Sequence, residues 1–188
     1  PTGEPIPEFS AEQSQTQLEK LPDDPAERIY RNFVKVEKNE NGTPTKITFN
    51  NTENFNFAFD LVDALAKREP KKLAMLHISK DKTERRFTFD DMRRASNQCA
   101  NYFKSIGIKK GDRVMLILKR HYQFWFAMLG LNKLGAIAIP ATNQLVEHDL
   151  EYRFKAAGIS AIICTADGES AAQVELASKK CPELVHKI

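Results

Sequence analysis

From residue 88 to the end of the chain, short apolar runs alternate with longer segments in which apolar residues recur every three or four positions. The short runs have the length of strands buried on both faces, and the longer segments have the period of amphipathic helices. Neighbouring parallel strands need a long crossover connection, which is usually a helix. The alternation therefore predicts an α/β fold with a largely parallel sheet of βα units. We expect strands at residues 114–118, 136–139, 161–164 and 184–188, and helices at residues 88–106, 122–134, 147–157 and 168–180.

The expected helices begin and end at recognisable residues. Thr88 and Asp91 have the spacing of a capping box, in which each side chain bonds a backbone amide of the other. Gly107, Gly135 and Gly158 stand where three of the helices should end, and glycine readily adopts the left-handed conformation found at helix ends. These signals support the boundaries predicted from the apolar period.

The part of the chain before residue 88 is less regular. Residues 1–54 contain a proline-rich lead-in and one expected short helix at residues 26–35, and we interpret them as an N-terminal extension. The remainder, residues 55–188, is expected to be the first α/β part of a larger domain. Because the last expected strand begins just before the chain ends, we interpret the chain as a fragment.

Two further elements are expected at the start of this α/β part. Apolar residues with helical spacing predict a helix at residues 57–68, which Pro70 stops. Two short apolar runs around a charged turn then predict a hairpin of residues 73–78 and 85–87. The hairpin precedes the first helix of the βα series.

Composition excludes several classes of protein. The chain has 28 Lys and Arg against 25 Asp and Glu, a formal net charge of +3, and its basic residues form only pairs such as Lys119 and Arg120. We interpret these pairs as solvated surface rather than a patch that binds phosphate or nucleic acid. The longest apolar stretch, residues 124–131, is less than half of the roughly 18 residues that a membrane-spanning helix needs. We therefore expect no membrane span and no nucleic-acid partner.

The cysteines indicate a reducing environment. Cys99, Cys164 and Cys181 are odd in number, widely spaced and without a CxxC pair, so they fit neither a disulfide framework nor a zinc site. From this we expect a cytoplasmic protein. Cys99 lies on the apolar stripe of the helix expected at residues 88–106, and we interpret it as a packing residue rather than a nucleophile.

Motifs for common enzyme chemistries are absent or incomplete. Gly130 and Gly135 have the spacing of a phosphate loop, but Ala136 and Ile137 stand where that loop needs lysine and serine or threonine. We interpret the two glycines as a packing site and a helix cap. No GxGxxG, HExxH or GxSxG occurs, and we interpret the histidines as surface or packing residues. The aromatic residues 124–126 are interpreted as core packing rather than an acyl pocket, because consecutive helix residues point in different directions.

Three stretches follow one another along the chain: residues 87–92 (FTFDDM), 107–114 (GIKKGDRV) and 133–140 (KLGAIAIP). In order and spacing they resemble segments of the AMP-forming acyl-CoA synthetases, a family of the adenylate-forming superfamily. Residues 140–145 (PATNQL) and 149–153 (DLEYR) are most similar to the medium-chain members of that family. The resemblance implies that the chain is an incomplete N-terminal part of the adenylate-forming synthetase fold.

The resemblance also implies a two-step ligation. A carboxylate, such as a medium-chain fatty acid, attacks the α-phosphate of Mg-ATP to give acyl-adenylate and pyrophosphate, and the CoA thiol then displaces AMP. The implied cofactors and partners are ATP, Mg²⁺, CoA and a small-molecule carboxylate. The family uses a Ser/Thr/Gly-rich phosphate loop with a lysine for the first step, and a mobile C-terminal domain with another lysine for the second. Neither occurs in these 188 residues, so no catalytic residue and no metal ligand is assigned to this chain.

One residue is carried over from the resemblance. Gln144 matches the glutamine that medium-chain synthetases place against CoA, and it lies in the loop after an expected parallel strand, where α/β sheets form ligand sites. An amide both donates and accepts hydrogen bonds without adding charge. Acetyl-CoA synthetases instead carry a pair of arginines for the CoA nucleotide where this chain has Ala171 and Val174. This departure argues against CoA binding of the acetate type.

Two alternatives stay open on the sequence alone. The first is an acetate or short-chain acyl-CoA synthetase. The second is a short, non-catalytic binding module that keeps half of the fold. The gene sequence beyond Ile188 separates enzyme from module: a Ser/Thr/Gly-rich loop with a lysine supports the enzyme, and a stop codon supports the module.

The purified 188-residue chain is expected to catalyse no carboxylate-dependent exchange between ATP and pyrophosphate. It has no phosphate loop to hold the triphosphate and neutralise the leaving pyrophosphate. The measurement is incorporation of labelled pyrophosphate into ATP with a medium-chain carboxylate present, and the same assay without carboxylate is the control. Incorporation above that control would contradict the prediction.

Overall fold

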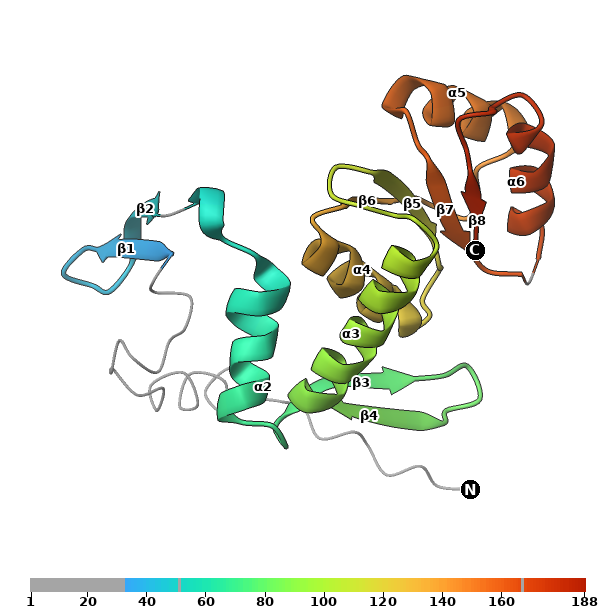
Figure 1. Cartoon of the computed structure of the whole chain (residues 1–188). Helices are drawn as coiled ribbons and strands as arrows, with labels where there is room; N and C mark the ends of the chain where they lie inside the picture. The colour runs from blue at the N-terminus through green and yellow to red at the C-terminus, as the bar shows by residue number, and fades with distance from the viewer. Residues whose placement is uncertain (1–32, 51, 167) are drawn as a thin grey trace. The chain divides into compact units, whose positions relative to one another are not determined.

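The computed structural model describes residues 33–50, 52–166 and 168–188 (Figure 1). The chain divides into two compact units, Pro1–Thr52 and Glu53–Ile188.

The described part of the first unit is a β-hairpin. Strand β1 (Val34–Lys38) pairs antiparallel with β2 (Pro44–Phe49). In the turn, the Asn39 side-chain oxygen accepts hydrogen bonds from two backbone amides, and Gly42 has a φ of 77°. Such turn chemistry closes a hairpin, because an Asn side chain replaces a backbone partner and glycine tolerates positive φ.

This hairpin corrects one prediction of the sequence analysis. The helix expected at residues 26–35 is wrong at its C-terminal end, because β1 already begins at Val34. The alternation of Val34 and Val36 with charged residues has the period of a strand, and it outweighs the helical spacing that precedes it. Residues 26–32 lie outside the described part of the chain.

The second unit begins with helical turns and a second hairpin. After η3 (Thr52–Asn54), a π-helical segment, η4 (Phe57–Asp63), continues into α2 (Ala64–Arg68), and this confirms the helix expected at residues 57–68. Asn56 caps this stretch, since its side-chain oxygen accepts from the amides of the next turn. Strands β3 (Leu73–Ile78) and β4 (Glu84–Thr88) then form the expected antiparallel hairpin.

Four parallel strands make the main sheet of the second unit, and their order is β6-β5-β7-β8. This confirms the predicted α/β fold with a parallel sheet. The strands are β5 (Arg113–Ile117), β6 (Ile137–Pro140), β7 (Ala161–Cys164) and β8 (His186–Lys187), and the helices are α3 (Phe89–Ser105), α4 (Gln123–Leu134), α5 (Glu147–Ala157) and α6 (Ser170–Ser178).

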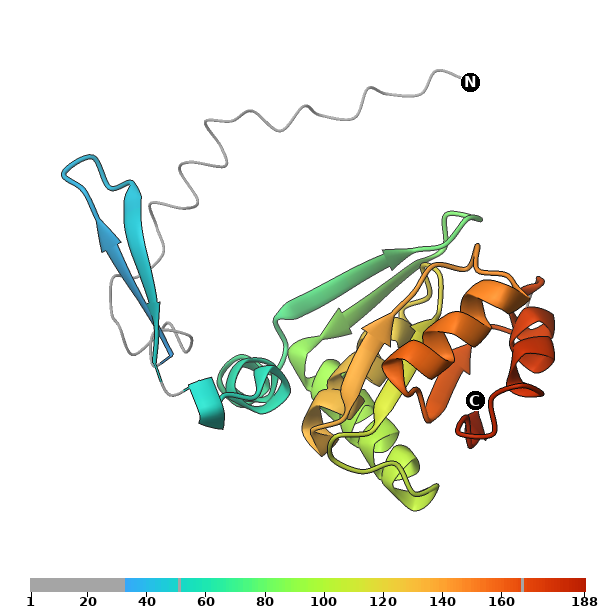
Figure 2. The same ribbon diagram turned by 90° about the horizontal axis from the view of Figure 1, so that it is seen from above.

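The sheet is covered on both faces. Alternate residues of β5 point to opposite sides, as the strand period requires. Met115 and Ile117 belong to one buried cluster with residues of α5 and α6, whereas Val114 and Leu116 belong to another with residues of α3 and α4. Figures 1 and 2 show the two helix pairs on opposite sides of the strands. The hydrophobic core around the sheet therefore has two layers that meet at β5.

Helix α3 begins at the predicted capping box. The Thr88 amide donates to the Asp91 carboxylate at 2.9 Å, and the Asp91 amide donates to Thr88 Oγ1 at 3.2 Å. Hydrogen bonds from the Thr88 amide and hydroxyl hold the pKa of the Asp91 carboxyl below its usual value. The first turn of α3 is thus closed by its own side chains.

Helices α3 and α4 pack closely through a glycine. A Cβ placed on Gly130 would lie 2.8 Å from Cys99 Cβ and 3.1 Å from the Ala100 backbone nitrogen, which leaves no room for a side chain. Gly135 ends α4 with a φ of 72°. The interpretation of these two glycines as a packing site and a helix cap is confirmed. Cys99 is confirmed as a packing residue, since it packs against the α3/α4 cluster.

A buried ion pair joins three helical segments. Lys133 Nζ on α4 lies 2.8 Å from Asp63 Oδ1 at the end of η4, and 2.6 Å from Asn97 Oδ1 on α3. The two charged side chains are only 4% and 14% exposed. Because an unpaired buried charge is costly, the pair holds these segments in one arrangement. Spacing along the sequence gave no sign of this contact.

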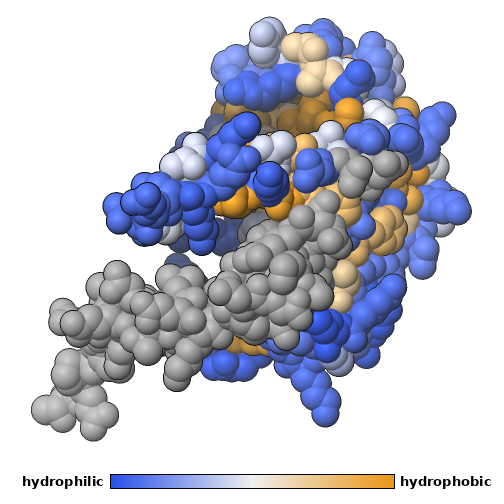
Figure 3. Space-filling view, turned by 90° about the vertical axis from the view of Figure 1, so that its left-hand side faces the viewer, coloured by the Kyte–Doolittle hydropathy of each residue, from blue (hydrophilic) through white to orange (hydrophobic). Residues whose placement is uncertain are grey.

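The surface of the described residues is mostly hydrophilic on the side shown in Figure 3, with apolar residues confined to smaller patches. Among these residues, no helix has the length and apolar character needed to cross a membrane.

Replacing Ile117 by Asp is expected to abolish folding. Ile117 is 1% exposed in the central strand, so the substitution places an unpaired charge in an apolar layer. The matched control is Ile137→Asp in the edge strand β6, where the side chain is 48% exposed. Thermal unfolding followed by circular dichroism should show a cooperative transition for the control and none for Ile117→Asp. Cooperative melting of Ile117→Asp would contradict the central position of β5.

Candidate functional site

The loops that follow β5, β6 and β7 lie at one edge of the sheet, because the strands run parallel. The chain passes from β5 to β6 on one side and then crosses to β7 on the other side, so its direction across the sheet reverses at β5. Open α/β sheets bind ligands at the carboxyl ends of the strands beside such a reversal. This edge, which we call the carboxyl edge, is therefore the candidate site.

Gln144 lies in the loop between β6 and α5, at the carboxyl edge. The loop is held at both ends: the Ala141 amide donates to the Leu116 carbonyl at 2.9 Å, and Leu145 is buried in the α5/α6 cluster. The backbone amide of Gln144 donates to Thr142 Oγ1 at 3.3 Å, and Gln144 is exposed. The structure thus places Gln144 where a ligand at this edge has access to it. Its contact with CoA stays a prediction.

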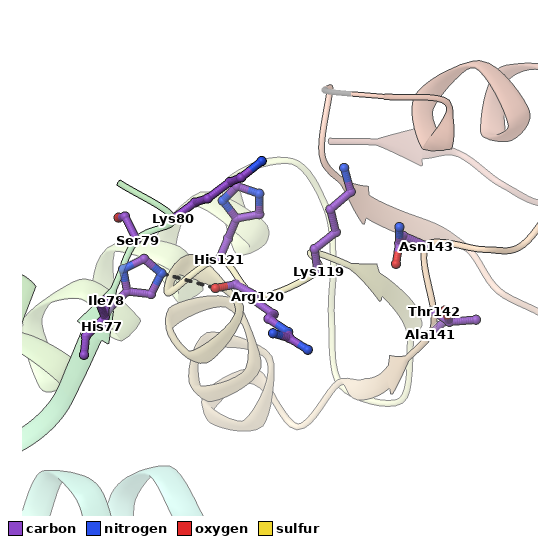
Figure 4. Close-up of a pocket in the computed structure, with 10 residues that line it drawn as sticks. All are labelled: His77, Ile78, Ser79, Lys80, Lys119, Arg120, His121, Ala141, Thr142 and Asn143. Carbon is purple, nitrogen blue, oxygen red and sulfur yellow. Dashed lines mark hydrogen bonds between the residues drawn. The ribbon is translucent and has the colours of Figure 1, made fainter. Parts of the chain in front are cut away.

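A pocket of about 910 Å³ opens beside this loop (Figure 4). We call it the carboxyl-edge pocket. Three segments line it: residues 77–80 at the turn between β3 and β4, residues 119–121 after β5, and residues 141–143 after β6. Gln144 follows the last of these segments directly. Lys119 and Arg120 are exposed, as expected from the sequence. Their place in a pocket with the β3–β4 turn depends on contacts between residues distant in the sequence.

His77 attaches the β3–β4 hairpin to the loop after β5. Its Nε2–H donates to the Arg120 carbonyl oxygen at 3.2 Å, and its ring meets the Tyr122 ring edge to face with centroids 5.3 Å apart. The other ring nitrogen, Nδ1, is buried and has no hydrogen-bond partner among the described residues. His77 is therefore a packing residue that shapes one wall of the carboxyl-edge pocket.

The aromatic residues 124–126 pack in different directions, as expected. Phe124 packs against the α3/α4 cluster, and Phe126 contacts the Phe87 ring edge to face at a centroid distance of 5.4 Å. Trp125 is 52% exposed. Core packing is thus confirmed for Phe124 and Phe126.

The cysteines do not provide a nucleophile at this edge. Burial raises the pKa of the Cys99, Cys164 and Cys181 thiols, which disfavours the reactive thiolate. All three are free cysteines.

The arrangement of acidic residues, glycines and cations among the described residues indicates what kind of ligand this edge suits. Within residues 33–50, 52–166 and 168–188, no group of three His, Cys, Asp or Glu side chains is arranged to hold a metal ion. The glycines at 130 and 135 serve helix packing and capping, so no phosphate loop is formed by them. The exposed Gln144 side chain and the basic residues of the carboxyl-edge pocket suit a polar, anionic ligand.

The chain is similar to a large group of enzymes. The family described as "AMP-binding enzyme" matches residues 62–188. Acyl-coenzyme A synthetase ACSM5, mitochondrial, of Rattus norvegicus is 34% identical over 142 residues, which are 72% of this chain and 24% of that protein. Acyl-coenzyme A synthetase ACSM3, mitochondrial, of Homo sapiens is 29% identical over 173 residues, which are 82% of this chain and 29% of that protein. The chain thus spans about a quarter of the length of these curated relatives.

Solved structures show the same fold. A fatty acyl CoA synthetase of Mycobacterium tuberculosis aligns with a TM-score of 0.63 and 24% identity, covering 71% of this chain and 26% of that chain. An acyl-CoA synthetase of Brucella canis aligns with a TM-score of 0.59 and 28% identity, covering 65% of this chain and 22% of that chain. These likenesses support the fold predicted from the motifs at residues 87–92, 107–114 and 133–140.

The comparison overturns the expected localisation. The sequence analysis predicted a cytoplasmic protein, but the relatives ACSM5 of Rattus norvegicus and ACSM3 of Homo sapiens are both named mitochondrial. This finding points away from the cytoplasm. The prediction was wrong because unpaired cysteines indicate a reducing environment and do not identify the compartment that provides it.

Proposed function

The chain belongs to the AMP-binding enzyme family, and on that premise we propose that it is the N-terminal portion of an ATP-dependent, AMP-forming acyl-CoA synthetase. The observation that carries the proposal is the family match over residues 62–188, joined to relatives named acyl-coenzyme A synthetases. The carboxyl edge of the sheet supports it, because this edge presents an exposed amide and a basic pocket at the place where α/β folds bind ligands.

The proposed reaction has two steps. In the first, a carboxylate oxygen bonds to the α-phosphorus of Mg-ATP, and pyrophosphate leaves with the electrons of the broken phosphoanhydride bond. In the second, the CoA thiol loses its proton and its sulfur bonds to the acyl carbon, while AMP leaves with the electrons of the broken bond between the acyl carbon and the phosphate oxygen. We propose a medium-chain fatty acid or a similar carboxylate as the acyl donor, because residues 140–145 and 149–153 are most similar to medium-chain members of the family.

The two parts of the chain have different proposed roles. Residues 55–188 are the first α/β part of the large N-terminal domain, and they provide the CoA-facing edge. Residues 1–54 are an extension that precedes it. The groups that neutralise the pyrophosphate charge and complete the thioester step belong to other parts of the full-length enzyme.

Gln144 is the proposed CoA contact in this chain. Its loop is anchored by the Ala141 amide and by buried Leu145, so the backbone of Gln144 has a defined position beside the pocket and its side chain is exposed. A glutamine amide offers two N–H donors and a carbonyl acceptor, which suits the amide and hydroxyl groups of the pantetheine arm. Because the glutamine amide is uncharged, this contact orients CoA and contributes little electrostatic attraction.

In the full-length enzyme, Gln144→Ala is expected to raise the apparent KM for CoA and to leave acyl-adenylate formation nearly unchanged. Loss of one neutral hydrogen bond costs about 0.5–1.5 kcal/mol, or roughly two- to tenfold in affinity. The two half-reactions are measured separately, by ATP–pyrophosphate exchange and by thioester formation.

The matched control is Asn101→Ala, which removes an exposed amide from α3, the helix that leads into the amino end of β5. This variant should leave both half-reactions unchanged. Equal losses in both half-reactions for Gln144→Ala would indicate a folding defect, and no loss in either would contradict the proposed contact.

A further inference from the structure

Among the described residues that line the carboxyl-edge pocket, three are permanent cations and none is acidic. These cations are Lys80, Lys119 and Arg120. Neither Lys80 nor Arg120 forms an ion pair with a residue that the structure describes. Cations concentrated in a concave site raise the local concentration of anionic ligands. The pocket therefore favours a ligand with negative charge.

Lys119 occupies a special place at the carboxyl edge. It lies two residues after the end of β5 and has a φ of 47°, a left-handed conformation that few non-glycine residues adopt. Its Nζ lies 3.4 Å from the position that a Cβ on Gly168 would occupy, so the ammonium group reaches from the end of β5 to the segment after β7. Helix α6, which follows that segment, carries no basic residue. Lys119 thus brings positive charge to the point where the strand order reverses.

Lys80 approaches the same pocket from the β3–β4 turn, and Asn143 approaches it from the loop after β6. Figure 4 shows these side chains reaching the pocket from separate segments. The volume of about 910 Å³ lies within the roughly 300–1,000 Å³ of small-molecule sites, so the pocket has room for more than an inorganic ion. Lysine binds phosphate as a point charge, and an asparagine amide adds a neutral donor.

We propose that Lys80 and Lys119 bind the phosphate groups at the nucleotide end of CoA, with the Asn143 amide as an additional donor. The inference rests on the proposed function, which makes CoA the substrate at this edge. Gln144 follows Asn143 in the chain, so one loop contributes both the neutral contact and one wall of the basic pocket.

The test compares CoA with dephospho-CoA in thioester formation by the full-length enzyme. Dephospho-CoA lacks the 3′-phosphate, which carries about −1.5 to −2 charges at pH 7. Lys80→Met and Lys119→Gly each remove one cation, and glycine accepts the positive φ of position 119 without strain. Each single variant should raise the KM for CoA by about 1.5- to fivefold, the range for one exposed charge pair. The double variant should show the product of the two effects and a weaker dependence of KM on salt.

Two controls accompany these variants. Lys119→Arg keeps the charge and should stay close to the wild-type KM for CoA. Lys104→Met removes an exposed charge near the end of α3, outside the pocket, and should leave the KM for CoA unchanged. A double variant that loses the preference for CoA over dephospho-CoA places the lysines on the 3′-phosphate. An equal rise in the KM for CoA and for dephospho-CoA places the lysines on the diphosphate. Either of these two results supports the inference.

The inference is overturned if the double variant keeps the wild-type KM for both thiols, if the KM for ATP rises instead, or if Lys104→Met has the same effect. Failure of the proposed function is distinguishable, because the wild-type enzyme would then form no thioester from CoA. In that case, isothermal titration of CoA into the wild type and the double variant tests the pocket directly. Equal affinities, or no binding to either protein, would overturn the inference.

Discussion

Burial of β5 on both faces is the constraint on which the second unit depends. Val114 and Leu116 face the α3/α4 layer, while Met115 and Ile117 face the α5/α6 layer. Each residue removed from water in this strand adds to one of the two apolar layers, and at about 25 cal/mol per Å² such burial is the main favourable term in folding. Because β6 and β7 pair with β5 on its two sides, the same strand sets the register of the sheet and the position of the loops at its carboxyl edge.

The helices that cover the sheet are held by specific contacts rather than by apolar burial alone. Gly130 lets α4 approach α3 so closely that any larger residue would collide with Cys99. The buried Lys133–Asp63 pair then joins η4 to this helix pair. On the same side of the fold, His77 bonds to the Arg120 carbonyl and brings the β3–β4 turn to the loop after β5. The β3–β4 turn forms one wall of the carboxyl-edge pocket, and the position of that wall thus depends on packing outside the main sheet.

Much of this architecture was predictable because its signals are local. The Thr88–Asp91 capping box, the glycine at the end of α4 and the apolar run of β5 each depend on residues close in sequence. The β1–β2 hairpin was missed because the helical spacing before it was extended into Val34, where the strand period already applied. The basic pocket was missed for a different reason. Tertiary packing places Lys80 and Lys119 in the lining of one pocket, and sequence spacing carries no information on such an arrangement.

The central claim of this account is that CoA binds at the carboxyl edge of the sheet, and amide hydrogen exchange of the full-length protein with and without CoA tests it most directly. Exchange reports local opening of backbone hydrogen bonds, so a bound ligand slows it where the ligand orders the chain. The account predicts slower exchange with CoA in the loops at residues 118–122 and 141–146, and no change in the β1–β2 hairpin. Protection confined to other segments, with both loops unchanged, would contradict it.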